Sequence, residues 1–320
     1  MLGLFREARF DRIILGNLQR FNLFKKIFPL GTGGTNNARY CYSVWMRHLY
    51  YYCQNANTKI PQTVAELGPG DSLGIGLTAL LTGAKKYVAL DVLKFWDNEK
   101  NIKIFDEILS LIQRKEPIPD DIEFPNIYPK LIDYSFPDTI INDDSLKESL
   151  NVNRIIEIRK ELIDPGNPSN SYIKYQIPWY DDKVIQKGSL DFVFSQAVLE
   201  HVDDLENAYK AMNLWLTDNG IMSHAIDFRS HGMTKSWNGH WSLTDFEWKI
   251  TRAGRVYAIN RMPLSEHIKM LSINNFNILE KKETKLENKL KSLYSSVIFQ
   301  NMSTDDIETG GVYILAQKFM

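Results

Sequence analysis

The stretch that decides the fold is residues 64–74, V-A-E-L-G-P-G-D-S-L-G, where a short apolar run leads into three closely spaced glycines. Residues 63–67 predict a buried strand, and residues 72–82 predict a helix that closes at Gly83. Glycines between a strand and a helix let the main chain approach a ligand, and the first N–H groups of the helix point toward it. The loop is therefore predicted to cradle a nucleotide-type ligand.

Two kinds of ligand compete for this loop. A dinucleotide fold uses the spacing G-x-G-x-x-G to seat a pyrophosphate, whereas Gly68, Gly70 and Gly74 are spaced G-x-G-x-x-x-G. Glu66 and Asp71 add two carboxylates, which would repel a pyrophosphate and suit a cationic or amine-bearing ligand. The second strand, residues 87–90, ends at Asp91, where a carboxylate can accept hydrogen bonds from both ribose hydroxyls of an adenosine.

Strands and helices alternate along most of the remaining chain. Further strands are predicted at 172–177, 190–194 and 221–226, and a helix that opens at Asp204 is expected to close at Asn219-Gly220. Such alternation predicts a mostly parallel sheet with right-handed crossovers. The last two strands, 276–280 and 311–316, lack a clear apolar helix between them, which predicts one antiparallel strand at the sheet edge.

Residues 189–205, S-L-D-F-V-F-S-Q-A-V-L-E-H-V-D-D-L, supply a further strand and turn. Together with the E-x-G-x-G loop and Asp91, in this order, they make the sequence resemble the class I S-adenosylmethionine-dependent methyltransferases, over residues 62–91 and 172–227. The resemblance implies a seven-stranded Rossmann-like α/β fold and S-adenosylmethionine as the cofactor. It also implies the cofactor-binding residues. Glu66, Gly68 and Gly70 would frame the methionine part, with Asp71 also in the binding loop, and Asp91 would hold the ribose. Ser195 and Gln196 would lie near the sulfur, and Trp179, after Ile177 and Pro178, at the adenine.

The candidate catalytic residues follow from the chemistry of methyl transfer. A hydroxyl acceptor is helped by a general base, and ligands bind outside the carboxyl ends of the strands in such sheets. Asp227 and His231, which follow the fifth strand, are the favoured candidates, and His201 is a further one. His224 lies within the strand and is disfavoured, as is His240. No metal is expected, because no histidine pair has i, i+4 spacing and no CxxC motif accompanies them.

The domain organisation is predicted as a helical cap at residues 1–60 and a methyltransferase domain at 61–320. An insertion at about 95–170, with helices at 98–114 and 145–162, is expected to form a lid over a small or medium acceptor. That acceptor is predicted to be a hydroxyl or amine of a sugar, a glycan or a secondary metabolite. Residues 13–28 are apolar and basic, which indicates either a helix packed on the domain or a peripheral membrane contact.

Composition narrows the class of protein. The 320 residues carry 38 Lys and Arg against 39 Asp and Glu, so no overall charge favours nucleic acid. Two cysteines and the lack of an apolar run of about 18 residues predict a cytoplasmic protein. Two alternatives stay open: a nicotinamide-dependent oxidoreductase, which the loop spacing and Glu66 disfavour, and a non-catalytic cofactor-binding scaffold.

Overall fold

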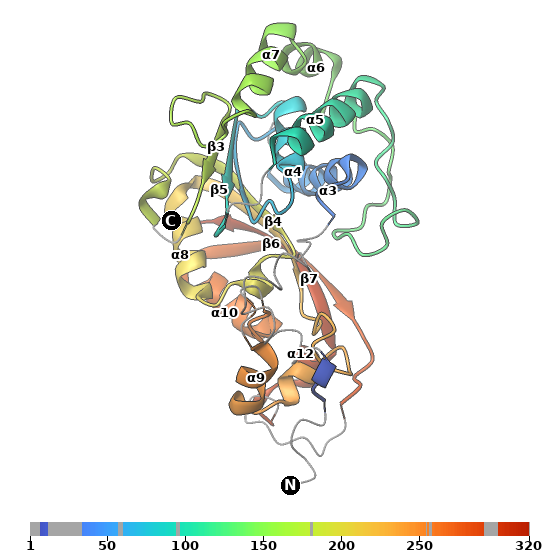
Figure 1. Cartoon of the computed structure of the whole chain (residues 1–320), viewed down its shortest axis with the longest axis vertical. Coiled ribbons are helices and arrows are strands. Elements are labelled where there is room, and N and C mark those ends of the chain that lie inside the picture. Colours follow the sequence, from blue (N-terminus) through green and yellow to red (C-terminus); the bar gives the residue numbers. More distant parts are fainter. Residues whose placement is uncertain are drawn as a thin grey trace.

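A seven-stranded sheet runs through the middle of the folded molecule (Figure 1). The computed structural model describes residues 7–11, 34–56, 60–93, 97–179, 182–253, 255, 258–290 and 300–319. The sheet order is β3-β2-β1-β4-β5-β7-β6. The strands are β1 (Thr63–Leu67), β2 (Lys86–Leu90), β3 (Ile173–Gln176), β4 (Leu190–Gln196), β5 (Leu216–Asp227), β6 (Phe276–Lys285) and β7 (Thr309–Lys318).

The strand directions confirm the predicted, mostly parallel sheet. Strands β1 to β5 pair in parallel, and β7 pairs antiparallel with both β5 and β6. The single reversed strand is therefore β7, and it lies one place in from the edge strand β6. The chain passes from β1 to β2 on one side and β4 lies on the other, so the carboxyl ends of these three strands lie side by side, where open parallel sheets bind their ligands.

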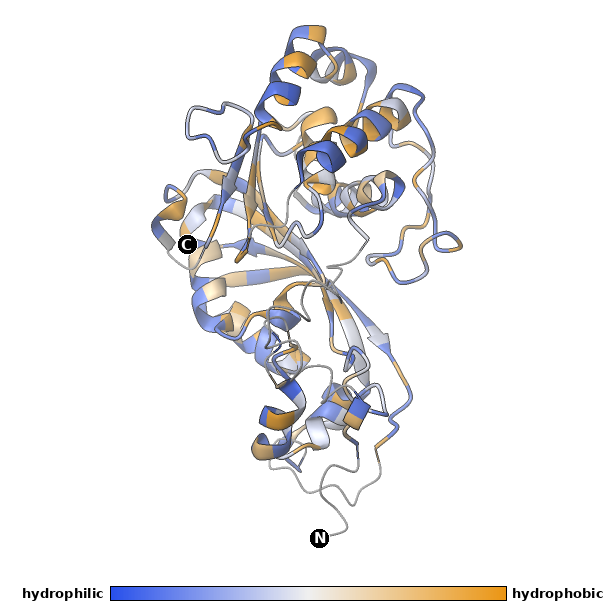
Figure 2. Cartoon of the chain, viewed as in Figure 1, coloured by the Kyte–Doolittle hydropathy of each residue, from blue (hydrophilic) through white to orange (hydrophobic). Residues whose placement is uncertain are grey.

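Helices cover both faces of the sheet (Figure 1). One face carries α3 (Ala38–Ala56), α4 (Gly74–Leu81) and α5 (Asn98–Gln113), and the other carries α8 (Leu205–Trp215) and α10 (Leu264–Ile273). All eight residues of α4 are buried, which explains why this helix is almost wholly apolar (Figure 2). This helix packs between the sheet, α3 and α5.

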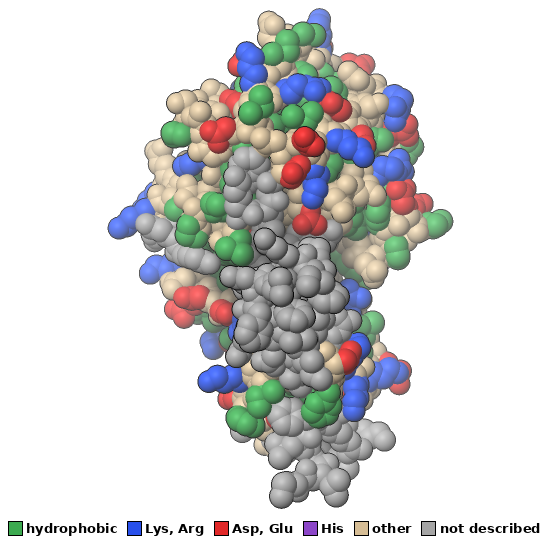
Figure 3. Space-filling view, viewed as in Figure 1, with side chains coloured by type: hydrophobic (Ala, Val, Ile, Leu, Met, Phe, Trp, Pro, Cys, Tyr) green, Lys and Arg blue, Asp and Glu red, His purple; other side chains and the backbone are tan. Residues whose placement is uncertain are grey.

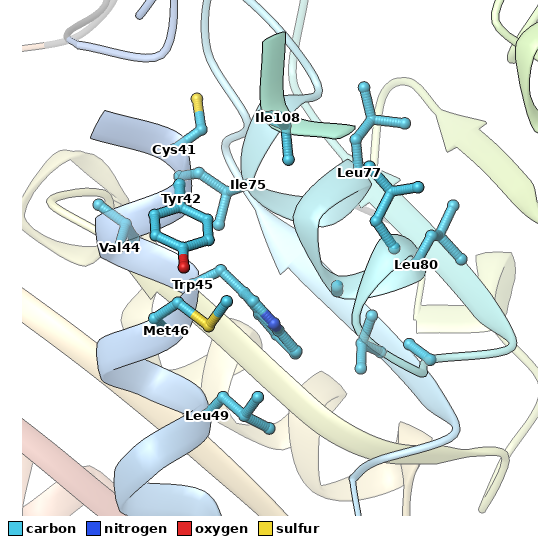
Figure 4. Close-up of a cluster of buried hydrophobic side chains, with 14 of the residues drawn as sticks. Cys41, Tyr42, Val44, Trp45, Met46, Leu49, Ile75, Leu77, Leu80 and Ile108 are labelled. Atoms are coloured by element: carbon cyan, nitrogen blue, oxygen red, sulfur yellow. The ribbon is translucent and has the colours of Figure 1, made fainter. Parts of the chain in front are cut away.

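Helix α3 is part of the main core (Figure 4). Trp45 is fully buried, donates from Nε1 to Thr82 Oγ1 at 2.8 Å, and packs with its ring centroid 5.5 Å from that of Phe194 in β4. The opposite side of the helix is buried too, because the chain after α5 wraps over it. Arg47, fully buried, donates to Asp121 and to three main-chain carbonyls of this wrapping segment.

The predicted insertion at 95–170 is joined to the core and contains three helices. The predicted helix at 98–114 is confirmed as α5, whereas the single helix predicted at 145–162 is wrong. It is divided into α6 (Asp143–Ser149) and α7 (Val152–Glu161). The cause is Asn151, whose side chain accepts a hydrogen bond from the N–H of Asn153 and so starts a new helix. The role of this segment as a lid stays a prediction.

A second, smaller group of elements lies below the sheet (Figure 1). It contains α9 (Asp245–Arg252), α12 (Thr304–Glu308) and residue Ala8, which forms an isolated bridge with Thr234. Three short 3₁₀ helices complete the described elements: η1 (Asp182–Val184), η2 (Leu199–His201) and η3 (Gly239–Ser242).

Two further predictions concern the end of one helix and an amphipathic stretch near the N-terminus. The predicted helix end at Asn219-Gly220 is wrong, because α8 stops at Trp215 and both residues lie inside β5. The amphipathic stretch predicted at 13–28 lies outside the described residues. Among the helices that the structure does describe, none is long and apolar enough to cross a membrane.

Candidate functional site

The turn between β1 and α4 requires its first two glycines. Gly68 has φ +63° and Gly70 has φ +74°, a region that residues with a Cβ rarely adopt. A Cβ on Gly68 would also lie 2.8 Å from Cγ2 of Val198. The Gly68 N–H donates to the carbonyl of Leu90 at 2.8 Å, which ties the turn to the end of β2. The backbone of the turn therefore requires glycine at positions 68 and 70, whereas the close approach to a ligand stays a prediction.

Glu66 lies beneath this turn and supports it from inside. Its side chain is buried and accepts a 2.6 Å hydrogen bond from the hydroxyl of Tyr87. Burial raises the pKa of Glu66 to about 8, so the carboxyl is protonated at neutral pH. The sequence-based argument that Glu66 repels a pyrophosphate is therefore not supported. The ring of Tyr87 in turn fills the space beside Gly76, where a Cβ would lie 2.0 Å from Cζ.

Asp91 has one carboxyl oxygen ready for a ligand. It follows β2 directly, is 5% exposed, and accepts the Val92 N–H on Oδ1 at 2.7 Å. Its Oδ2 is buried and has no hydrogen-bond partner among the described residues. Burial raises the pKa of Asp91 to about 6, against the main-chain N–H groups of Val92, Leu93 and Gly70, which lower it. The carboxyl thus lies beside the glycine turn with an unsatisfied acceptor, as a ribose site requires.

The other predicted cofactor residues lie in different surroundings. Ser195 is fully buried and its hydroxyl is bonded to Nδ1 of His224 at 2.7 Å, so this side chain belongs to the sheet core. Gln196, the next residue, points to the opposite face, where its Oε1 lies 3.3 Å from Nε2 of His48.

Trp179 is 7% exposed and packs edge-on against Trp215. Asp71 is half-buried in the turn. Their cofactor roles stay predictions.

The three candidate catalytic residues meet at the ends of β4 and β5. Nε2 of His231 lies 3.3 Å from Oδ2 of Asp227, and the rings of His231 and His201 are 5.1 Å apart in an edge-to-face arrangement. Arg229 also binds Asp227, with Nη2 2.6 Å from Oδ2. The hydrogen bonds and charges of His231 and Arg229 hold the pKa of Asp227 well below its usual range, despite its burial. Asp227 is therefore ionised, and its contact with Nε2 orients the ring of His231.

Glu200 joins this cluster, and the sequence gives no warning of it. The residue is 2% exposed, and neither carboxyl oxygen has a hydrogen-bond partner among the described residues. The turn that carries it is held rigidly, because Asn260 donates from its side chain to the carbonyls of Leu199 and Val202.

The remaining candidates of the sequence have structural contacts. His224 and His240 are buried, and burial lowers the pKa of each to about 3. Both imidazoles are therefore neutral at physiological pH and enclosed by protein. Two arginines near the cluster are paired as well: Arg252 forms an ion pair with Asp203, and Arg261 forms one with Asp245. The groups that remain as candidates for binding and chemistry are the glycine turn, Asp91 and the cluster of His201, Asp227 and His231.

The sheet order, with five parallel strands and a reversed β7 between β5 and β6, agrees with the resemblance noted in the two sequence motifs. The chain thus has the seven-stranded Rossmann-like α/β fold that this resemblance implies. No model of a known protein family matches the sequence, and no curated protein matches it significantly.

Three solved structures to which this chain is similar are distant from it in sequence. A SAM-dependent methyltransferase from Methanosarcina mazei is 14% identical, with a TM-score of 0.44, over 85% of this chain and 99% of its own. An S-adenosylmethionine-dependent methyltransferase from Mesorhizobium loti is 11% identical, with a TM-score of 0.42, over 84% and 97%. A complex that contains the Haloferax volcanii Trm112 methyltransferase activator matches at 14% identity and a TM-score of 0.40, over 88% and 94%. Values this low are no basis for a function, which has to come from the site.

Proposed function

We propose that this protein is an S-adenosylmethionine-dependent methyltransferase that acts on a hydroxyl or amine of a small or medium acceptor, such as a sugar, a glycan or a secondary metabolite. The observation that carries the proposal is the unsatisfied Oδ2 of buried Asp91 beside Gly70. A ligand that donates two hydroxyls there satisfies a polar atom that otherwise costs folding free energy. The same sheet edge carries the Asp227–His231 pair, where an acceptor would be activated.

The chain's own residues divide the work between them. Bound S-adenosylmethionine would supply a methyl group already activated by a positively charged sulfur. Asp91 would accept the ribose hydroxyls, and Gly68 and Gly70 would let the main chain approach the ligand. His231 would take the proton from the acceptor hydroxyl as the new O–C bond forms and the S–C bond breaks. Asp227 would stabilise the resulting imidazolium by its contact with Nε2.

The surface supports a small acceptor over a nucleic acid. On the face that Figure 3 shows, Lys and Arg side chains are mixed with Asp and Glu, and no area of one sign stands out. Nucleic-acid binding relies on a continuous basic surface to neutralise phosphates. We also propose that the protein works in the cytoplasm, in keeping with its two free cysteines, Cys41 and Cys53.

The test of this function has two steps. Isothermal titration should detect S-adenosylmethionine binding and no NADH binding, which separates the methyltransferase from a nicotinamide-dependent oxidoreductase. Incubation with a cell extract and cofactor labelled in the methyl group should then move label into an acceptor, whereas His231→Asn should slow that transfer at least tenfold. Binding of NADH alone would refute the proposal, and cofactor binding without transfer to any extract would favour the scaffold.

Cofactor affinity should depend on pH through Asp91. The ribose hydroxyls would donate to the ionised carboxylate, so the cofactor binds the charged form of Asp91. The affinity therefore reaches its full value above the pKa of Asp91 in the cofactor-free protein, which is about 6. Below that pH a proton must be lost on binding. We expect the dissociation constant to be flat from pH 7 to 8 and about tenfold weaker at pH 5. Titrations at each pH measure this, and the dependence should vanish in Asp91→Asn. An affinity that stays constant down to pH 5 would show that Asp91 is not the ribose ligand.

A further inference from the structure

The cluster at the ends of β4 and β5 contains an unexplained buried carboxyl group. Glu200 is 2% exposed, and its two oxygens have no hydrogen-bond partner in the described part of the chain. A buried carboxylate is retained only where a cation, a proton or hydrogen-bond donors compensate its charge. The nearest other chemistry-bearing side chains are His201, beside it in η2, and His231, from the loop after β5.

We propose that Glu200, His201 and His231 bind one divalent transition-metal ion, Zn²⁺ being the simplest probe, at the acceptor side of the site. One ligand atom from each of these residues lies within 4.8 Å of the others. The ligand atoms of a tetrahedral ion lie about 2.1 Å from it and so about 3.4 Å from one another, which means that the side chains need to close by up to about 1.4 Å. Two imidazoles and one carboxylate favour ions such as Zn²⁺, Fe²⁺ or Mn²⁺ over Mg²⁺ or Ca²⁺.

The surroundings of the cluster are those of a prepared metal site. Ligating histidines commonly have a carboxylate at their second nitrogen, and Oδ2 of Asp227 lies 3.3 Å from Nε2 of His231. The main chain of Glu200 is fixed as well, since its carbonyl accepts the N–H of Asn260 at 2.7 Å. His231 itself is held with φ +50°, and its loop is closed by a 2.7 Å hydrogen bond from the Ser230 N–H to the Trp237 carbonyl.

This metal site cannot be recognised from the spacing of its residues in the sequence. His201 and His231 lie 30 positions apart and have neither helical nor CxxC spacing, which is why the sequence predicts no metal. They meet because β4 and β5 are neighbours in the sheet and both end at the same edge. The inference rests on the proposed methyltransferase function for its role: an ion here would bind the acceptor oxygen and lower the pKa of its hydroxyl. His231 would then serve as a ligand instead of a free base.

Metal binding by the full-length chain tests the proposal directly. The chain is stripped with a chelator, incubated with Zn²⁺ and desalted, and bound metal is measured by mass spectrometry while isothermal titration gives the affinity. We expect one Zn²⁺ per chain, with binding weakened at least tenfold in Glu200→Gln and in His231→Asn. Asparagine is chosen at position 231 because it tolerates the left-handed backbone. Asp203→Asn, an exposed acid next to the turn, serves as the matched control and should bind as the parent does.

The outcomes separate this inference from the methyltransferase proposal. Thermal unfolding of the metal-free variants shows whether each is folded, and His231→Asn keeps the test valid if Glu200→Gln is not. Absence of bound Zn²⁺, or affinity within twofold of the parent in every folded ligand variant, would overturn the metal site. Binding of S-adenosylmethionine to the metal-free chain is measured in parallel, because the Asp91 side of the crevice has no ligand of the cluster. Loss of that binding alone would count against the methyltransferase and leave the metal site standing.

Discussion

Asp91→Asn should weaken the binding of S-adenosylmethionine by about ten- to a hundredfold. The buried Oδ2 of Asp91 has no partner among the described residues, so two ribose hydroxyls would find an ionised acceptor there. Hydrogen bonds to a charged group are worth about 1.5–3 kcal/mol, and a neutral amide with one donor end cannot accept both hydroxyls. Isothermal titration at pH 8 gives the two dissociation constants.

The control for this variant is Asp144→Asn, which removes an exposed carboxylate from the first turn of α6. It has the same change of net charge and lies away from the crevice, so its dissociation constant should equal that of the parent. Equal affinity in Asp91→Asn and Asp144→Asn would remove the main support for the methyltransferase proposal. Asp91→Asn should keep or raise the stability, because it replaces a carboxyl whose burial already disfavours its charge.

Gly76→Ala should lower the free energy of unfolding by about 3 kcal/mol. The new Cβ would lie 2.0 Å from Cζ of Tyr87, so the fully buried ring has to move. Overpacking a core costs about 1–3 kcal/mol, and the shift also breaks the hydrogen bond from Tyr87 to buried Glu66. Urea unfolding measures the change, and cofactor affinity should fall with it because Glu66 supports the turn.

The matched control is Gly166→Ala. A Cβ there would approach nothing closer than 3.8 Å, and this glycine has no left-handed backbone. Its free energy of unfolding should stay within about 0.5 kcal/mol of the parent. If Gly76→Ala behaves the same way, the ring of Tyr87 does not define the space under the turn.

The strands and the order of the motifs could be read from the sequence because each depends on local pattern. The apolar run into Gly68, the carboxylate at the end of the second strand and the F-S-Q-A-V-L-E-H-V stretch all lie within short windows. The break between α6 and α7 was not readable in the same way. The apolar period of 145–162 continues across Leu150, and only the capping hydrogen bond of Asn151 divides it.

The parts of the site that sequence reasoning missed depend on contacts across the sheet. Gly76 has an ordinary helical position, and its need for glycine comes from Tyr87 on the neighbouring strand. Glu200 looks like a residue at the start of a helix, and its lack of partners follows from the burial of the turn. The pairing of Ser195 with His224 likewise arises only because β4 and β5 are adjacent. No local pattern encodes these relations.

The place of α3 has a consequence for how the protein can be handled. Trp45 and its neighbours pack directly on Phe192 and Phe194 of β4. A shortened chain that started at residue 61 would leave these rings and the part of the sheet that α3 covers open to water, which promotes aggregation. Residues 34–56 are thus as necessary to a soluble recombinant fragment as the strands themselves.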